Sequence, residues 1–99
     1  MAELKIGVST IAAGVGALEW HTEILADGVS VDTLTHALTA VSDGALTGHG
    51  FHRLEVSLRA SDQPARRAVL RAGFRQEGIR RQAHTGEDGS FEDVIIFAG

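Results

Sequence analysis

The stretch that decides the fold is residues 51–74, FHRLEVSLRASDQPARRAVLRAGF. Its first part alternates apolar Leu54, Val56 and Leu58 with polar or charged residues. This period of two is typical of a β-strand that buries one face and leaves the other polar. The stretch therefore begins with a strand that forms part of a core.

A short helix is predicted to follow this strand. Ser61 or Asp62 can cap its first turn, where Pro64 is tolerated because the first helical N–H groups have no partner within the helix. The helix runs through Ala72, and Gly73 stands where a C-terminal glycine belongs. A buried strand and a capped helix are thus predicted next to each other.

The flanking residues extend this pattern in both directions. On the C-terminal side, residues 74–83 and 91–97 are predicted strands that flank the turn-rich segment 85–90, which indicates a hairpin. On the N-terminal side, residues 18–24 alternate like a strand, and apolar residues recur at helical spacing from Leu34 to Ala45.

Two further features complete the N-terminal side. Asp32 is the predicted N-cap of this first helix. Leu4, Ile6 and Val8 also alternate like a strand. The predicted order is therefore strand, strand, helix, strand, helix, strand, strand, in a mixed α/β sheet without a sequence repeat.

Composition limits the classes of protein to consider. With 99 residues, of which 43% are hydrophobic and 22% charged, the chain is expected to form one domain over residues 1–99. It has no cysteine, which excludes disulfides and thiolate chemistry, and it contains no apolar run of the roughly 18 residues that a membrane span needs. The uncharged run 6–18 has the length of a signal peptide, but its glycines favour a strand and a turn. We therefore expect a cytoplasmic protein.

Charge is distributed unevenly along the chain, whose net charge is -4. Residues 1–52 hold six acidic residues and Lys5, whereas residues 53–81 hold eight arginines against three acidic residues. An arginine-rich centre suits a phosphorylated ligand or a nucleic-acid backbone. The alternative, which composition alone favours, is a set of solvated faces that pair with the acidic segments. Because few aromatic residues accompany the arginines, we do not favour nucleic acid as a partner.

Four short segments carry a family resemblance: HRLEV at 52–56, ARRAVLRAGF at 65–74, EGIRR at 77–81 and DVIIF at 93–97. In this order and at these separations they resemble the C-terminal half of the GNAT superfamily of acyl-CoA-dependent N-acetyltransferases, nearest to the ribosomal-protein-alanine acetyltransferases. The resemblance implies an α/β (α+β) fold: a mixed, mostly antiparallel sheet of about five strands with two helices. The first strand and first two helices of the family have no counterpart, so the domain is expected to be a truncated one.

The resemblance also implies a function. Members of the family transfer the acetyl group of acetyl-CoA directly to an amine, and a protein N-terminus is one candidate acceptor. Residues 18–24 align with the central strand that holds the thioester, and Gly28–Thr33 align with the loop that binds the CoA pyrophosphate. The residues assigned to CoA binding are Thr22, Gly28, Val29, Ser30, Val31, Asp32, Thr33 and Asp62.

A catalytic base is expected beside the thioester. His21 shares one face of the predicted strand with Glu19 and Glu23, and a neutral imidazole can accept a proton near pH 7. His21 is therefore the candidate base. The alternative is that these three residues form the exposed polar face of an edge strand.

The sequence departs from the family pattern at several positions. Leu25 replaces the polar first residue of the pyrophosphate loop, and Asp27 and Asp32 bring negative charge towards a phosphate. Asp62 stands where the family has Asn, and Ala65 where this branch has Ser. The chain has no tyrosine, so the usual acid that protonates the CoA thiolate is missing. These departures favour an alternative function, a catalytically inactive GNAT-like remnant that acts as a binding or oligomerisation module.

Partners follow from the same considerations. A sheet shortened in this way leaves an edge and an apolar face open, which a second copy could cover, so we expect a homodimer. His36, His49 and His52 have spacings compatible with a metal, but no third ligand is indicated and no metal site is predicted. Trp20, on the apolar face of its predicted strand, is expected in the core.

Overall fold

The computed structural model describes residues 5–20, 29–48 and 50–99. In chain order its elements are β1 (Gly7–Ala12), β2 (Val15–Glu19), α1 (Val31–Gly48), β3 (Arg53–Arg59), α2 (Gln63–Arg71), β4 (Arg75–Thr85) and β5 (Phe91–Ala98). The predicted order of strands and helices is therefore confirmed. No helix in these described ranges is long and apolar enough to cross a membrane.

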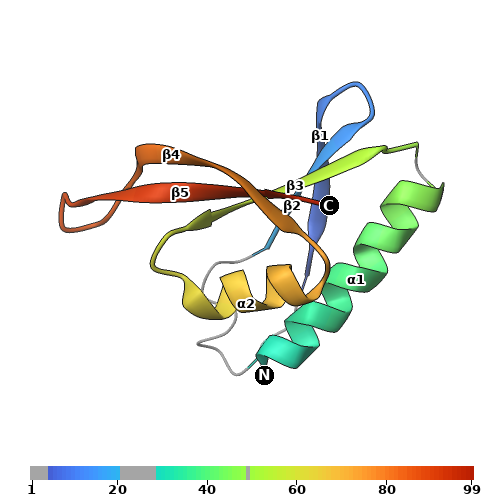
Figure 1. Ribbon diagram of the computed structural model, residues 1–99, viewed down its shortest axis with the longest axis horizontal. Helices are drawn as coiled ribbons and strands as arrows, with labels where there is room; N and C mark the ends of the chain where they lie inside the picture. Colours follow the sequence, from blue (N-terminus) through green and yellow to red (C-terminus); the bar gives the residue numbers. More distant parts are fainter. Residues whose placement is uncertain (1–4, 21–28, 49) are drawn as a thin grey trace.

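The five strands form one sheet in the order β1-β2-β3-β5-β4 (Figure 1). Strands β2 and β3 are parallel neighbours joined through α1, and the other neighbouring pairs are antiparallel. Helix α2 joins β3 to β4, which lies at the edge of the sheet beyond β5. The expected mixed, mostly antiparallel sheet with two helices is confirmed.

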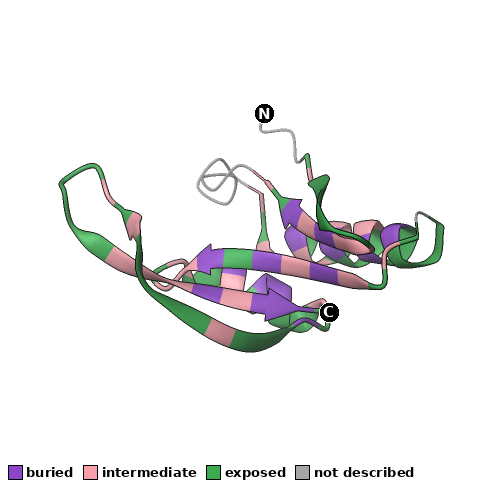
Figure 2. Ribbon diagram, turned by 90° about the horizontal axis from the view of Figure 1, so that it is seen from above, coloured by how far each residue is buried: buried purple, intermediate pink, exposed green. Residues whose placement is uncertain are grey.

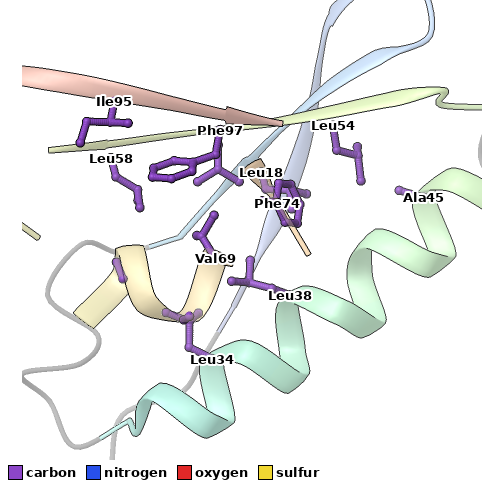
Figure 3. Packing of buried hydrophobic residues seen from close by; sticks show 13 residues of the cluster. Leu18, Leu34, Leu38, Ala45, Leu54, Leu58, Val69, Phe74, Ile95 and Phe97 are labelled. Atoms are coloured by element: carbon purple, nitrogen blue, oxygen red, sulfur yellow. The ribbon is translucent and has the colours of Figure 1, made fainter. Parts of the chain in front are cut away.

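The core lies between the helices and one face of the sheet (Figure 3). Alternate residues of β3 and β5 are buried there, as the period of two predicts, and β2 contributes Leu18. Both helices turn an apolar stripe towards these strands. The buried residues of α1 are Leu34, Leu38, Ser42 and Ala45, and those of α2 are Ala65, Ala68 and Val69. Figure 2 shows that burial is concentrated in β2, β3, β5 and the two helices, while β1 and β4 are mostly exposed.

Helix α1 begins with a cap that the sequence did not place correctly. The Ser30 Oγ accepts a hydrogen bond of 3.1 Å from the N–H of Thr33, and the Ser30 carbonyl accepts the N–H of Leu34 at 3.0 Å. Ser30 is therefore the N-cap, and the prediction that Asp32 caps this helix is wrong. Asp32 lies inside the first turn, where its negative charge is favourable to the helix dipole.

Both ends of α2 follow the sequence. The Asp62 carboxylate caps the helix by accepting a hydrogen bond of 3.3 Å from the N–H of Ala65. At the other end, the N–H of Gly73 bonds the Leu70 carbonyl and the N–H of Phe74 bonds the Val69 carbonyl. This Schellman arrangement requires a left-handed residue after the helix, and Gly73 has a φ of +95°.

The second strand starts earlier than predicted. The expected strand over residues 18–24 overlaps β2 only at Leu18 and Glu19, because Ala13 and Gly14 form the turn from β1 and pairing resumes at Val15. Residues 21–24 of the predicted strand lie outside the described residues. The predicted alternation of apolar and polar faces is correct for the two residues that overlap, since Leu18 is buried and Glu19 is exposed.

Gly14 joins this hairpin to β3. Its carbonyl accepts the N–H groups of His52 at 2.8 Å and Arg53 at 3.3 Å. Its φ of +73° lies in the left-handed region, and a Cβ added there would clash with the imidazole Nδ1 of His52. Gly44, in the middle of α1, has no such constraint, because a Cβ added there meets nothing.

We therefore expect alanine to have opposite effects at these two glycines. Gly14→Ala should lower the free energy of unfolding by about 1–3 kcal/mol because it forces a non-glycine residue into a left-handed, crowded position. Gly44→Ala should raise it by about 1 kcal/mol because alanine favours the helix. Urea unfolding followed by circular dichroism measures both, and equal changes at the two sites would contradict the role given to Gly14.

Candidate functional site

The parallel pairing of β2 and β3 is short. Its register covers Val15↔Arg53, Gly16↔Leu54 and Ala17↔Glu55, and then stops. Both strands continue beyond this point, β2 to Glu19 paired with β1 and β3 to Arg59 paired with β5. The sheet therefore opens between β2 and β3 at their carboxyl ends, which is where ligands bind in sheets that contain parallel β-α-β units.

This opening is a cleft of about 450 Å³. The described residues that line it are Ala17, Leu18, Glu19, Trp20, Ser57, Leu58, Arg59, Asp62, His84 and Val94. One wall is the end of β2, and the other is the end of β3 with the start of α2 and the neighbouring part of the β4–β5 hairpin. Figure 1 shows that α1 and α2 both begin at this end of the sheet.

The two faces of the sheet contribute different side chains to the cleft. Residues that face each other on neighbouring strands project to the same side. Ser57↔Ile96, Arg59↔Val94 and His84↔Glu92 are such pairs. Alternation along β3 places Ser57 and Arg59 on the face away from the helices, whereas Leu58 belongs to the buried core. A ligand in the cleft therefore meets an apolar wall on the helix side and polar groups on the open side.

The backbone is as important here as the side chains. Past Ala17 and Glu55, the inner edges of β2 and β3 no longer hydrogen-bond to each other. A strand edge presents alternating N–H and C=O groups that an extended ligand with amide groups can pair with. Leu18 and Leu58, which line the cleft and are 4% and 7% exposed, keep this part of it apolar.

Charged groups of both signs border the cleft. Glu19 accepts a hydrogen bond of 3.2 Å from the Ser9 hydroxyl on β1, and Asp62 is engaged as the α2 cap. Arg59 and His84 also line the cleft. Glu92, the cross-strand partner of His84, accepts the N–H of Ser61.

The setting of Glu92 favours its charged form. Hydrogen bonding from Ser61 lowers the pKa of the Glu92 carboxyl, and the neighbouring Arg59 and His84 side chains act in the same direction. An ionised carboxylate therefore lies across the ladder from His84, at the border of the cleft.

Of the residues assigned to CoA binding, Asp62 is the one that lies among the described residues lining the cleft, and its role there stays a prediction. Val29, Ser30, Val31, Asp32 and Thr33 lead into and begin α1, and they are not among the described lining residues. His21, Thr22 and Gly28 lie outside the residues that the structure describes, so their roles stay predictions.

Asp32 has a partner that the sequence did not reveal. Its Oδ1 lies 2.8 Å from Nη1 of Arg71, at the end of α2. Both side chains are exposed, so the pair adds little stability. It does offset negative charge at the start of α1, where the sequence alone indicated an uncompensated acid.

Sequence reasoning missed most of the β3 wall. Ser57 and Arg59 are the polar members of an alternating strand, a signal that marks an outward face but not a cleft. His84 lies in β4 beyond a register shift between Arg80 and His84, and no local sequence pattern indicates its place at the cleft. Trp20 was expected in the core; it is half-buried, packs on the core and also lines the cleft.

No group of three metal-ligating side chains occurs within residues 5–20, 29–48 and 50–99. His52, one of the histidines whose spacing is compatible with a metal, donates its backbone N–H to the Gly14 carbonyl in the turn between β1 and β2.

The sequence matches no protein-family model and no curated protein. The fold, however, matches solved structures. A GNAT-family acetyltransferase from Bacillus anthracis superposes with a TM-score of 0.82 at 14% identity, covering 97% of this chain and 57% of that one. Ribosomal-protein-S5-alanine acetyltransferase from Vibrio fischeri gives 0.78 at 13% identity, covering 97% and 51%. RimJ from Mycobacterium smegmatis, in complex with CoA-disulfide, gives 0.77 at 25% identity, covering 97% and 45%.

These likenesses define the class of fold. The chain has the GNAT fold and spans about half the length of the solved structures it matches. The expected resemblance to GNAT acetyltransferases, including those of ribosomal-protein alanine, is confirmed at the level of the fold.

The Glu92 carboxylate should influence stability in acid. Because its pKa is lowered in the folded state, it stabilises the fold above its ordinary pKa, and this contribution is lost as the pH falls through the folded value. Glu92→Gln should therefore weaken the fall in unfolding free energy between roughly pH 6 and pH 3. Urea unfolding over this pH range measures the slope. Glu87→Gln, in the hairpin turn, is the control, and identical slopes in the two variants would contradict this role of Glu92.

Proposed function

We propose that the protein binds acetyl-CoA in the cleft between β2 and β3 and transfers its acetyl group to an amine. The observation that carries this proposal is the early end of the parallel β2–β3 pairing, beyond which the facing edges of the two strands border an apolar cleft without pairing with each other. The GNAT fold supports it, as does the CoA bound to the RimJ of similar fold. Because this chain is about half as long as those structures, the activity is a proposal for this chain.

The geometry suits the pantetheine arm of CoA. This arm is an extended chain with two amide groups, which can hydrogen-bond the free edges of β2 and β3 as an added strand would. Leu18 and Leu58 offer apolar contact near the thioester. An N–H on the β2 edge, aimed at the thioester oxygen, would stabilise the negative charge that develops there during attack.

The phosphates are assigned to the start of α1. The first N–H groups of a helix lack partners within it and favour an anion. Ser30 already occupies the N–H of Thr33, which leaves the N–H groups of Val31 and Asp32 in the first turn. Arg71, paired with Asp32, supplies positive charge beside them. With Gly28 and Val29, these residues remain the proposed pyrophosphate site.

The reaction itself requires two proton transfers. The amine nitrogen attacks the thioester carbon, the C–S bond breaks with its electron pair on sulfur, and the nitrogen loses a proton to a base while the thiolate gains one. His21 remains the proposed base. Among the described residues that line the cleft, Glu19 and His84 also carry groups that can accept a proton. A protein N-terminus is the proposed acceptor, in keeping with the alanine acetyltransferases of similar fold.

Two further proposals concern the whole protein. We place it in the cytoplasm on the ground of its cysteine-free composition. We also propose a homodimer, because the sheet leaves long stretches of both edge strands exposed.

Calorimetric titration with acetyl-CoA tests the proposed binding, and release of CoA thiol in the presence of peptides with free N-termini tests the transfer. We expect binding by the wild-type protein and loss of affinity by at least ten-fold in Ser57→Trp, whose indole would fill the cleft. Ala40→Trp, on the exposed side of α1, is the matched control and should bind normally. Binding without transfer to any tested amine would favour the inactive binding module, and no binding at all would contradict the proposal.

Asp62 offers a second test because it caps α2 and also lines the cleft. Asp62→Asn keeps an acceptor for the Ala65 N–H but removes a negative charge, so we expect acetyl-CoA, an anion, to bind several-fold more tightly at unchanged stability. Asp62→Ala removes the cap and should lower the free energy of unfolding by about 1 kcal/mol. Titration and urea unfolding of both variants separate the two roles. Weaker binding by Asp62→Asn would contradict the electrostatic part of this account.

A further inference from the structure

The sheet ends in two open edges of different character, β1 on one side and β4 on the other. Strand β4 is ill suited to pair with another strand. It carries Arg75, Glu77, Arg80 and Arg81, and its register with β5 shifts at two places. The second shift lies between Arg80 and His84, and Gln82, within it, has a left-handed φ of 52°. Charges and bulges of this kind are the means by which natural sheets keep an edge from pairing.

Strand β1 differs from β4 in charge, although its register with β2 also shifts at one place, between Thr10 and Ala12. Its sequence, GVSTIA, contains no charged residue and no proline, and all six residues are exposed. Val8 is 37% and Ile11 54% exposed. The uncharged run extends from Ile6 to Leu18, so the adjoining turn and β2 bring no charge before Glu19. An exposed edge strand without charge or proline is a template for pairing with another chain.

We propose that β1 pairs with β1 of a second copy of this chain, antiparallel about a two-fold axis, so that two five-stranded sheets join into one. This inference rests on the homodimer part of the proposed function and specifies where the copies meet. A two-fold pairing of β1 with β1 uses the same edge of both copies, so assembly stops at a dimer. Pairing of β1 with β4 of another copy would leave one edge free at each end, so further copies could add. A β4–β4 pairing would set arginines of the two copies against each other, which is unfavourable.

This mode of pairing leaves the cleft accessible. Strand β1 lies on the side of β2 that faces away from β3. It also supports the β2 wall, since Gly7 pairs with Glu19 and the Ser9 hydroxyl donates to the Glu19 carboxylate. A partner on the outer edge of β1 would thus hold this wall in place without entering the cleft.

The interface is small, because only six residues of each copy form the strand pair. Interfaces at the low end of the size range are weak and transient. We therefore expect a dimer that forms at high protein concentration and dissociates on dilution, rather than a permanent one.

Sedimentation velocity across a wide range of protein concentration tests this inference. We expect a concentration-dependent dimer in the wild type. Ile11→Lys places a like charge on each copy at the proposed interface and should raise the dimer dissociation constant by at least ten-fold. Ile79→Lys is the matched control, because Ile79 is 49% exposed on the other edge strand, and its dimer should match that of the wild type.

The possible outcomes separate the claims. A wild type that stays monomeric overturns both the dimer and its β1 interface, and acetyl-CoA titration of the same sample still tests the cleft. A dimer that resists Ile11→Lys, or that Ile79→Lys disrupts instead, overturns the β1 interface alone. Thermal unfolding at the lowest concentration shows whether Ile11→Lys is folded, because there its midpoint should equal that of the monomeric wild type.

Discussion

The site depends on where β2 and β3 stop pairing. Parallel neighbours joined through a helix normally continue side by side, yet here the ladder ends after three residue pairs. What keeps the strands in place beyond that point is their other edges, β2 against β1 and β3 against β5. The sheet can therefore open in its middle without coming apart, and beyond the last pair the facing backbones of β2 and β3 no longer bond to each other, next to core residues such as Leu18 and Leu58.

The same constraint explains the arrangement around the cleft. Helices that follow β2 and β3 must begin at the carboxyl ends of these strands, so the α2 cap and the start of α1 lie at the end of the sheet where it opens (Figure 1). Asp62 consequently serves the stability of α2 while it borders the cleft. At the start of α1, Ser30 is the cap and Arg71 offsets Asp32, so the acids in this segment are less unfavourable to an anion than the sequence suggests.

Much of the fold could be predicted from local patterns. Alternation in residues 53–59 and the Gly73 C-terminus each follow from a few neighbouring residues and were predicted correctly, and the α2 cap was narrowed to Ser61 or Asp62, of which the structure uses Asp62. The start of β2 was missed because Val15, Gly16 and Ala17 lack a clear alternation and the turn at Gly14 depends on its contact with His52. The cleft was missed at Arg59 and His84 because their proximity depends on strand order and on the register shift in β4, which no local pattern encodes. Asp62 was assigned to CoA binding from a family resemblance, and the structure places it at the cleft without testing that role.

The central claim is that the gap between β2 and β3 receives acetyl-CoA. Backbone amide signals in a ¹⁵N-correlation spectrum, recorded while acetyl-CoA is added, test it most directly. We expect the largest shifts at Leu18, Glu19 and Trp20 on one wall and at Ser57, Leu58 and Arg59 on the other, with little change in β4 between Arg75 and Arg80. Shifts confined to the arginines of α2 and β4, or no saturable shifts at all, would contradict binding in the cleft.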